Sequence, residues 1–151
     1  MLAISHLLIA LLAAKALRFD SIWSLAVAAF FAVLPDMDMP VGFGKINPFA
    51  RYIYAKFGHR NITHSLIFAL LATSILAINQ ELWLAALLGI FSHYASDMLT
   101  YTGIPLFWPY KKNFVLLGGP LLTGSWHELV IVFIAALGIV VLTLSGGVIQ
   151  W

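Results

Sequence analysis

The 151-residue sequence contains no cysteine and few charged residues. Without cysteine the chain has no disulfide bond, thiolate metal ligand or cysteine nucleophile, so any metal ion must be bound by histidines and carboxylates. Charged residues make up 9% of the chain and hydrophobic residues 62%. A soluble domain has about 25% charged and about 45–50% apolar residues. The six acidic and eight basic residues are too few to cover a water-facing surface, so the composition predicts a membrane protein.

The hydrophobic residues fall into separate segments, which are 6–17, 22–35, 64–78, 82–98 and 128–145. At about 1.5 Å per residue, a helix of 15 residues spans roughly 22 Å, less than the roughly 30 Å hydrocarbon core of a bilayer. We therefore expect an all-α fold, a polytopic bundle of about five short transmembrane helices in one membrane-embedded domain, residues 1–151.

Polar residues mark several of the expected helix ends. Asp20-Ser21 can cap the second helix, and Pro35 closes it. Thr63 can cap the third helix, and Asn79 makes the turn into the fourth. Small side chains would let the helix backbones approach closely, and they include Ala28, Ala29, Ala85, Ala86 and Gly89.

Two connections, 36–63 and 99–127, are long and rich in glycine, proline and aromatic residues. Within the first, 42–57 is expected to be an interfacial loop with a short amphipathic turn. If the five helices alternate in direction, both long connections and the N-terminus share one side. That side carries six of the eight basic residues, which are Lys45, Arg51, Lys56, Arg60, Lys111 and Lys112. The positive-inside rule then predicts a multi-pass membrane protein with this side in the cytoplasm.

The same alternation places all five histidines and four of the six acidic residues on the loop side, leaving only Asp20 and Glu81 opposite. The residues that gather there are His6, Asp36, Asp38, His59, His64, His93, Asp97, His127 and Glu128. An ionisable group at membrane depth is costly, by about 2.5–3.5 kcal/mol for a central Asp, so this cluster needs a compensating partner. A divalent metal ion would provide one.

His93 and Asp97 are four residues apart, which puts an imidazole and a carboxylate on one helix face within reach of a single ion. Zinc accepts both ligand types, and a catalytic zinc site keeps one position open for water. A nitrogen and oxygen ligand set also suits Mn²⁺ or Fe²⁺. The spacing therefore predicts a divalent metal site, most simply for Zn²⁺.

Other readings exist for single members of the cluster. Asp36 and Asp38 could be solvated acids in a helix-terminating turn, and His59 is more simply an interfacial cation. The pair at 127–128 begins like the His-Glu-x-x-His motif of zinc proteases, but Ile131 stands where the second histidine must be. An intramembrane metalloprotease is therefore disfavoured. The sequence also lacks a Gly-x-Ser-x-Gly elbow, which leaves a serine lipase without support.

These residues give the chain a family resemblance. Its sequence resembles the YdjM-like family of small inner-membrane proteins, which are regarded as membrane-bound metal-dependent hydrolases. The matching blocks follow in order along most of the chain, and they are His6, 35–38, 59–65, 92–100 with Gly103, and 124–128.

That family in turn is similar to the all-helical fold of zinc-dependent phospholipase C and S1/P1 nuclease, whose phosphodiesterase site holds several zinc ions. The resemblance implies a metal held by His93 and Asp97 on one helix, by His64 at the start of another, and by Asp36 or Asp38. It also implies that His6 binds a further ion which shares Asp97. Further downstream ligands have only His127 and Glu128 as counterparts here, so we expect one or two ions.

The function that follows is a metal-dependent phosphoesterase acting on a lipid-borne phosphate at the membrane face, with membrane lipid as its partner and no nucleic acid. The bound metal would activate water for attack on phosphorus. The unligated member of the Asp36 and Asp38 pair could serve as general base or second-metal ligand, and Arg60 is the candidate phosphate clamp. Lys111 and Lys112 could attract anionic headgroups, or could equally serve as positive-inside anchors.

The alternative is a non-enzymatic membrane protein with a structural or transported metal. A carrier should have ionisable groups that continue across the membrane, yet the helix centres at 25–33, 66–76 and 129–141 contain none. This absence favours a one-sided site over a transport pathway, while a structural metal stays open.

Overall fold

The computed structural model describes residues 1–38, 48–57 and 60–145. In these residues the regular elements are helices, accompanied by isolated β-bridges between Thr100 and Leu121 and between Ile104 and Phe114. The α-helices are α1 (Ala3–Ala16), α2 (Ile22–Val33), α4 (Pro48–Phe57), α5 (Leu66–Ser74), α6 (Gln80–Met98) and α7 (Trp126–Leu144). Short 3₁₀ helices, η1 (Leu34–Asp38) and η2 (Ile62–His64), follow α2 and precede α5. The all-α prediction is confirmed for the described part of the chain.

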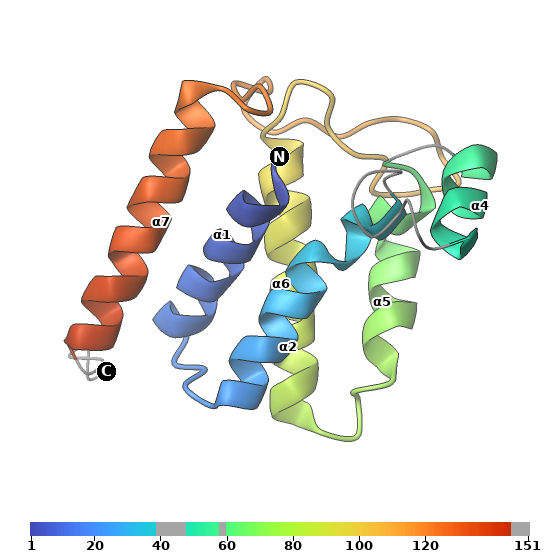
Figure 1. The fold of residues 1–151 in the computed structure, drawn as a ribbon. Coiled ribbons are helices and arrows are strands. Elements are labelled where there is room, and N and C mark those ends of the chain that lie inside the picture. The colour runs from blue at the N-terminus through green and yellow to red at the C-terminus, as the bar shows by residue number, and fades with distance from the viewer. Residues whose placement is uncertain (39–47, 58–59, 146–151) are drawn as a thin grey trace.

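Helices α1, α2, α5, α6 and α7 lie side by side, and each corresponds to one of the predicted apolar segments (Figure 1). Helix α6 is central, because it packs against α1, α2 and α5, and its contact with α2 is the most extensive. Helix α7 packs on α1. The start of α1, η1 and the 99–125 connection lie at one end of the bundle, while the short turns after α1 and α5 lie at the other (Figure 1).

The segment predicted as an interfacial loop contains more regular structure than expected. Residues 48–57 form the ten-residue helix α4, which begins at Pro48. Proline is favoured in the first turn of a helix because its missing N–H would have no partner there. Helix α4 contacts η1 and lies beside the bundle at its loop end (Figure 1).

The structure places one of the predicted caps at a different residue. Asn79 does cap α6, since its Oδ1 accepts a hydrogen bond from Leu82 N at 3.1 Å. The N-cap of α5 is Ser65 rather than Thr63, because η2 occupies 62–64 and Ser65 Oγ accepts from Phe68 N at 3.2 Å. Ser21 stands at the N-cap of α2 without a side-chain hydrogen bond.

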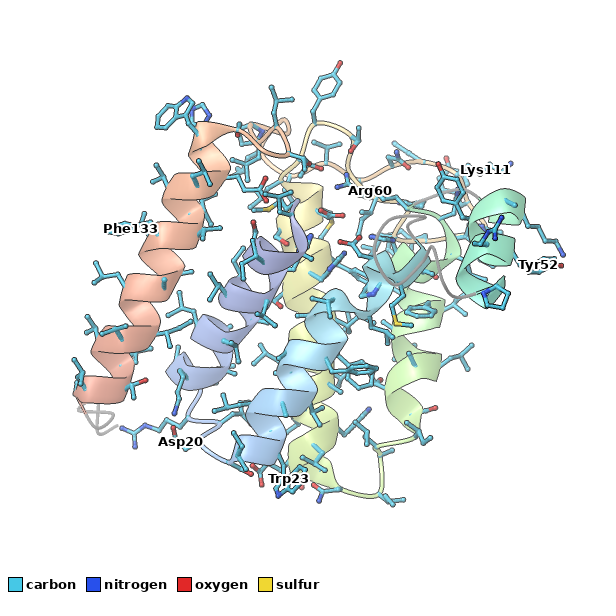
Figure 2. The ribbon with its side chains drawn as sticks, in the orientation of Figure 1. Asp20, Trp23, Tyr52, Arg60, Lys111 and Phe133 are labelled. Atoms are coloured by element: carbon cyan, nitrogen blue, oxygen red, sulfur yellow. The ribbon has the colours of Figure 1, made fainter. Side chains whose placement is uncertain are left out.

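The apolar surface of the molecule is large. Phe133 on α7 is 69% exposed and points away from the bundle, as Figure 2 shows. Among the described helices, Trp126–Leu144 alone is both long and apolar enough to cross a membrane, whereas the apolar helices α1 and α2 are shorter. The structure therefore contains one clear candidate span, and the five-span arrangement stays a prediction from the sequence.

Small residues bring α2 and α6 into backbone contact, as the sequence predicted. A Cβ atom added at Gly89 would lie 2.3 Å from the carbonyl oxygen of Ala28. Ala28, Ala85 and Ala86 are fully buried around this crossing. The main-chain approach at Gly89 thus fixes the height of α2 against α6, and with it the position of η1.

We expect Gly89→Ala to destabilise the protein, because the new methyl group meets a backbone carbonyl that cannot move aside. An overpacked core site costs roughly 1–3 kcal/mol, which outweighs the roughly 1 kcal/mol that alanine contributes to helix propensity. Thermal unfolding in detergent should show a lowered Tm.

Gly138→Ala in α7 is the matched control. A Cβ atom there would lie 2.8 Å from Cδ1 of Leu12, the flexible end of a side chain. Its Tm should stay near that of the unchanged protein, and a Gly89→Ala variant equally stable would contradict the proposed packing.

Candidate metal centre

Four side chains from three elements converge at the loop end of the bundle. Asp36 comes from η1, His64 from η2, and His93 and Asp97 from the last turns of α6. One potential ligand atom from each residue lies within 4.8 Å of the other three. His64, His93 and Asp97 are fully buried, and the side chain of Asp36 is 7% exposed. The structure thus brings together the residues on which the predicted metal site depends.

Five of the six distances between the ligand atoms are close to those of a tetrahedral site. His64 Nε2 lies 3.1 Å from His93 Nε2, 3.6 Å from Asp36 Oδ1 and 3.5 Å from Asp97 Oδ2. His93 Nε2 lies 3.7 Å and 3.8 Å from the same two oxygens. A tetrahedral ion with ligands at about 2.1 Å holds its ligand atoms about 3.4 Å apart. In addition, Asp97 Oδ2 is buried and has no hydrogen-bond partner, so the residues fit a bound cation.

Hydrogen bonds orient both histidines toward this point. His93 Nδ1 lies 2.7 Å from the carbonyl oxygen of Ala32, which can only accept, so Nδ1 carries the proton and Nε2 presents its lone pair. His64 Nδ1 lies 3.0 Å from Thr63 Oγ1. The hydroxyl of Tyr94 donates to the carbonyls of Thr63 and Ser65 at 2.8 Å and 2.9 Å, which holds η2 against α6. Such outer contacts fix ligand geometry in metal sites.

His6 approaches the same two carboxylates from the other side. Its Nε2 lies 3.4 Å from Asp97 Oδ1 and 3.8 Å from Asp36 Oδ2, the oxygens that do not face His64 and His93. Its Nδ1 contacts Ser96 Oγ at 2.8 Å, and its ring stacks on His93 at a centroid distance of 3.7 Å. His6 Nε2 is also buried without a hydrogen-bond partner. Each carboxylate therefore offers one oxygen to each side, an arrangement suited to bridging two ions.

Arg60 forms the outer edge of the cluster. Its NH2 donates to Asp97 Oδ1 at 2.9 Å, while NH1 donates to Thr100 Oγ1 at 2.8 Å and to Thr102 Oγ1. The amine of Met1 donates to the same oxygen of Asp97 at 2.6 Å. A positive charge thus sits directly against one ligand of the predicted ion, at the end of the bundle where Figure 2 labels Arg60 and Lys111.

The carboxylate of Glu128, a predicted metal ligand, has other hydrogen-bond partners in the structure. This buried carboxylate accepts hydrogen bonds from Leu2 N at 2.6 Å, Ser5 Oγ at 2.5 Å and Gly124 N at 2.6 Å. It therefore ties the start of α1 to the start of α7 and lies outside the four-residue cluster. Glu128 follows the exposed His127 at the start of α7, so its sequence position near the loop end did not distinguish a structural role from ligation.

Two other predicted residues cannot be placed. The side chain of Asp38 and all of His59 lie outside the described residues. The contributions of Ser96, Thr63, Thr100 and Tyr94 were not predicted from the sequence. Ser96 carried a partial signal, because it lies three residues after His93 on the same helix, whereas a single sequence contains no signal for the tyrosine contact with η2.

The charges of the cluster shift the acidity of its members in the metal-free protein. Burial raises the pKa of Asp36, but the neighbouring His64, His93 and His6 outweigh it and hold the pKa at about 2. Burial lowers the pKa of His64, yet Asp36 and Asp97 outweigh that effect and raise the pKa above 6.5. A bound ion therefore competes with protonation of His64.

We expect His93→Ala and Asp97→Ala to lose bound zinc, with affinity falling at least about tenfold, because each removes one ligand of a four-ligand site. Elemental analysis of the purified variants measures the metal content. Glu128→Gln is the matched control and should keep its metal, since Glu128 contacts only backbone and Ser5. Full metal occupancy in His93→Ala would refute the site.

Zinc affinity should rise with pH. Below the raised pKa of His64 the proton competes with the metal, so affinity should fall by up to about tenfold per pH unit, and above that pKa it should level off. Zinc titrations between about pH 5.5 and 8, in two buffers of different ionisation enthalpy, report both the affinity and the released proton. An affinity independent of pH, with no proton release, would contradict His64 as a ligand.

Comparison with known proteins supplies a family for this geometry. The family described as YdjM inner membrane protein matches residues 1–151. The inner membrane protein YdjM of Escherichia coli (strain K12) is 38% identical over 105 residues, which cover 62% of this chain and 54% of the relative. The chain thus spans about half the length of that relative, and of the equally similar YdjM of Shigella flexneri.

A third relative is covered more fully. The uncharacterized protein YvsG of Bacillus subtilis (strain 168) is 31% identical over 116 residues, covering 73% of this chain and 71% of the relative. No solved structure matches the chain. The similarity to zinc-dependent phospholipase C and S1/P1 nuclease stays a prediction from the sequence.

Proposed function

Because this chain belongs to the YdjM inner membrane protein family, we propose that it is a membrane-bound, metal-dependent phosphoesterase acting on a lipid-borne phosphate. The observation that carries the proposal is the close grouping of Asp36, His64, His93 and Asp97 with a guanidinium at its edge. Cations on both sides of a phosphate are what phosphoryl transfer requires, since its transition state carries spread negative charge.

The four residues of the cluster would hold the ion, with His6 available to a second one through the outer oxygens of both carboxylates. A divalent ion there supplies Lewis acidity, which lowers the pKa of water and neutralises phosphate charge. In the net reaction one water is consumed. Its oxygen bonds to phosphorus, one phosphorus–oxygen ester bond breaks, and the alcohol leaves with a proton.

Arg60 is the residue of this chain that would bind the phosphate itself. The hydrogen bonds to Asp97, Thr100 and Thr102 hold its guanidinium in one position next to the ligands. A guanidinium matches phosphate oxygens in geometry and charge, and one already fixed in place loses little entropy on binding. Arg60 thus combines a positioning contact to Asp97 with the clamp role expected from its place before His64.

The membrane explains why the phosphate is proposed to be lipid-borne. The cluster lies at one end of a bundle whose outer surface is apolar, with Phe133 and Leu144 both widely exposed. A lipid phosphate lies at the headgroup level, where the end of a bundle meets it. The basic residues at this end, including the exposed Lys111 and Lys112, support a cytoplasmic site face.

A structural metal is the second candidate function. The complete burial of His64 and His93 favours it, because structural metal sites are closed to solvent. The two candidates differ in whether a phosphate reaches the ion, which activity measurements decide.

Hydrolysis by the zinc-loaded protein in detergent micelles tests the proposal. We expect release of p-nitrophenol from bis(p-nitrophenyl) phosphate, and a fall of about 10²–10³ in kcat/KM for Arg60→Ala, which removes a charged donor from the transition state. Arg18→Ala is the matched control, since Arg18 follows α1 at the opposite end of the bundle, and its rate should be unchanged.

The outcomes separate the two candidates. The phosphoesterase is supported if His93→Ala loses activity and added metal does not restore it. Stable metal binding without hydrolysis of phosphodiesters, phosphomonoesters or phospholipids would overturn the proposal in favour of a structural metal.

A further inference from the structure

An open pocket lies beside the metal cluster, with a volume of about 500 Å³. This is within the range of about 300–1,000 Å³ typical of small-molecule sites. Besides Met1, its walls are formed by Arg60, Asn61, Thr102, Gly103, Asn113 and Thr123. Most of them come from the connection between α6 and α7, which the metal ligands do not use.

The connection that builds this pocket is held in place by its own backbone. Ile104 and Phe114 exchange two hydrogen bonds, of 3.2 Å and 2.8 Å. Gly103 has a positive φ of 60°, and a Cβ atom there would lie 2.3 Å from Phe114 O, so no other residue fits. Asn113 Nδ2 donates to Thr102 O at 2.9 Å across the same turn. The pocket wall is therefore formed before any ligand binds.

Arg60 joins the pocket to the metal cluster. The same guanidinium lines the pocket, donates to Asp97 Oδ1 at 2.9 Å and donates to Thr102 Oγ1. A phosphate held between the cluster and Arg60 would therefore have one ester substituent next to Thr102 and Asn113. In a phospholipid that substituent would be the headgroup.

The chemistry of the walls discriminates between headgroups. The side chains that line the pocket offer amides and hydroxyls, which both donate and accept hydrogen bonds, and a single charged side chain, that of Arg60. Quaternary ammonium groups are recognised by aromatic cages, and amines by carboxylates. The residues lining this pocket include neither, and Arg60 would repel a cation.

We infer that this pocket binds the uncharged, hydroxyl-bearing headgroup of a phosphate ester, of the glycerol or inositol kind, in preference to a cationic headgroup. The inference rests on the proposed function, of which it names the substrate class. Hydroxyl groups of a polyol would pair with Thr102, Asn113 and Thr123, and the phosphate with Arg60.

Isothermal titration of the zinc-loaded protein measures this preference as binding, independently of catalysis. The probes are sn-glycerol 3-phosphate, phosphocholine and inorganic phosphate, the last of which reports the metal and Arg60 alone. We expect glycerol phosphate to bind at least tenfold more tightly than either of the others. Equal affinity for all three would overturn the inference.

A charge substitution sharpens the test. Thr123→Asp places a carboxylate in the pocket at an exposed position and leaves the hydrogen bonds that hold the wall unchanged. It should weaken the binding of glycerol phosphate about tenfold and strengthen the binding of phosphocholine. Gln80→Glu adds the same charge at the exposed start of α6, at the opposite end of the bundle, and should change neither.

Phospholipid competition identifies the source of the headgroup. Displacement of glycerol phosphate by phosphatidylglycerol micelles, and not by phosphatidylcholine micelles, supports a lipid ligand, whereas no displacement by either assigns the pocket to a soluble ester. Selective binding without hydrolysis of any ester would overturn the proposed function and keep the pocket. Hydrolysis of bis(p-nitrophenyl) phosphate without headgroup selectivity would support the proposed function and overturn the inference about the pocket.

Discussion

The cost of burying two carboxylates, Asp36 and Asp97, determines how the elements at the loop end of the bundle are arranged. The carboxylate of Asp97 on α6 contacts His6 from α1, His64 from η2 and also Arg60. Side chains from three elements therefore meet at this one residue. Carboxylates so far from water are costly unless cations surround them. The convergence of these elements at one end of the bundle satisfies that requirement, and it also produces the geometry of a metal site.

Helix packing in the middle of the bundle positions the residues at its loop end. The backbone contact between Gly89 and Ala28 sets α2 against α6, and four residues further along each helix Ala32 O accepts a hydrogen bond from His93 Nδ1. The turn that follows α2 then places Asp36 opposite His93. Apolar packing of small residues in the middle of the bundle and metal-ligand geometry at its end are thus parts of one arrangement.

Much of this could be predicted from the sequence where the signal is local. Apolar segments correspond to α1, α2, α5, α6 and α7, and the i, i+4 spacing of His93 and Asp97 identified the helix that supplies two residues of the cluster. The N-cap of α5 was predicted wrongly, because a short 3₁₀ helix moves the cap from Thr63 to Ser65 without any change in hydrophobic pattern. The hydrogen bonds of Glu128 could not be predicted for a different reason, since they come from residues at 2, 5 and 124.

The helices, the membrane character and the group of ionisable residues at one end could all be predicted from the sequence alone. Each of them depends on the order of hydrophobic and polar residues along the chain, which is a local pattern. Which acid joins the cluster, and which of its oxygens faces which histidine, depends on the tertiary structure. Asp36 and Glu128 both lie near the loop end, and their roles differ because α2 packs on α6 while α7 packs on α1. Such pairings depend on side-chain shape between distant segments, which no local pattern specifies.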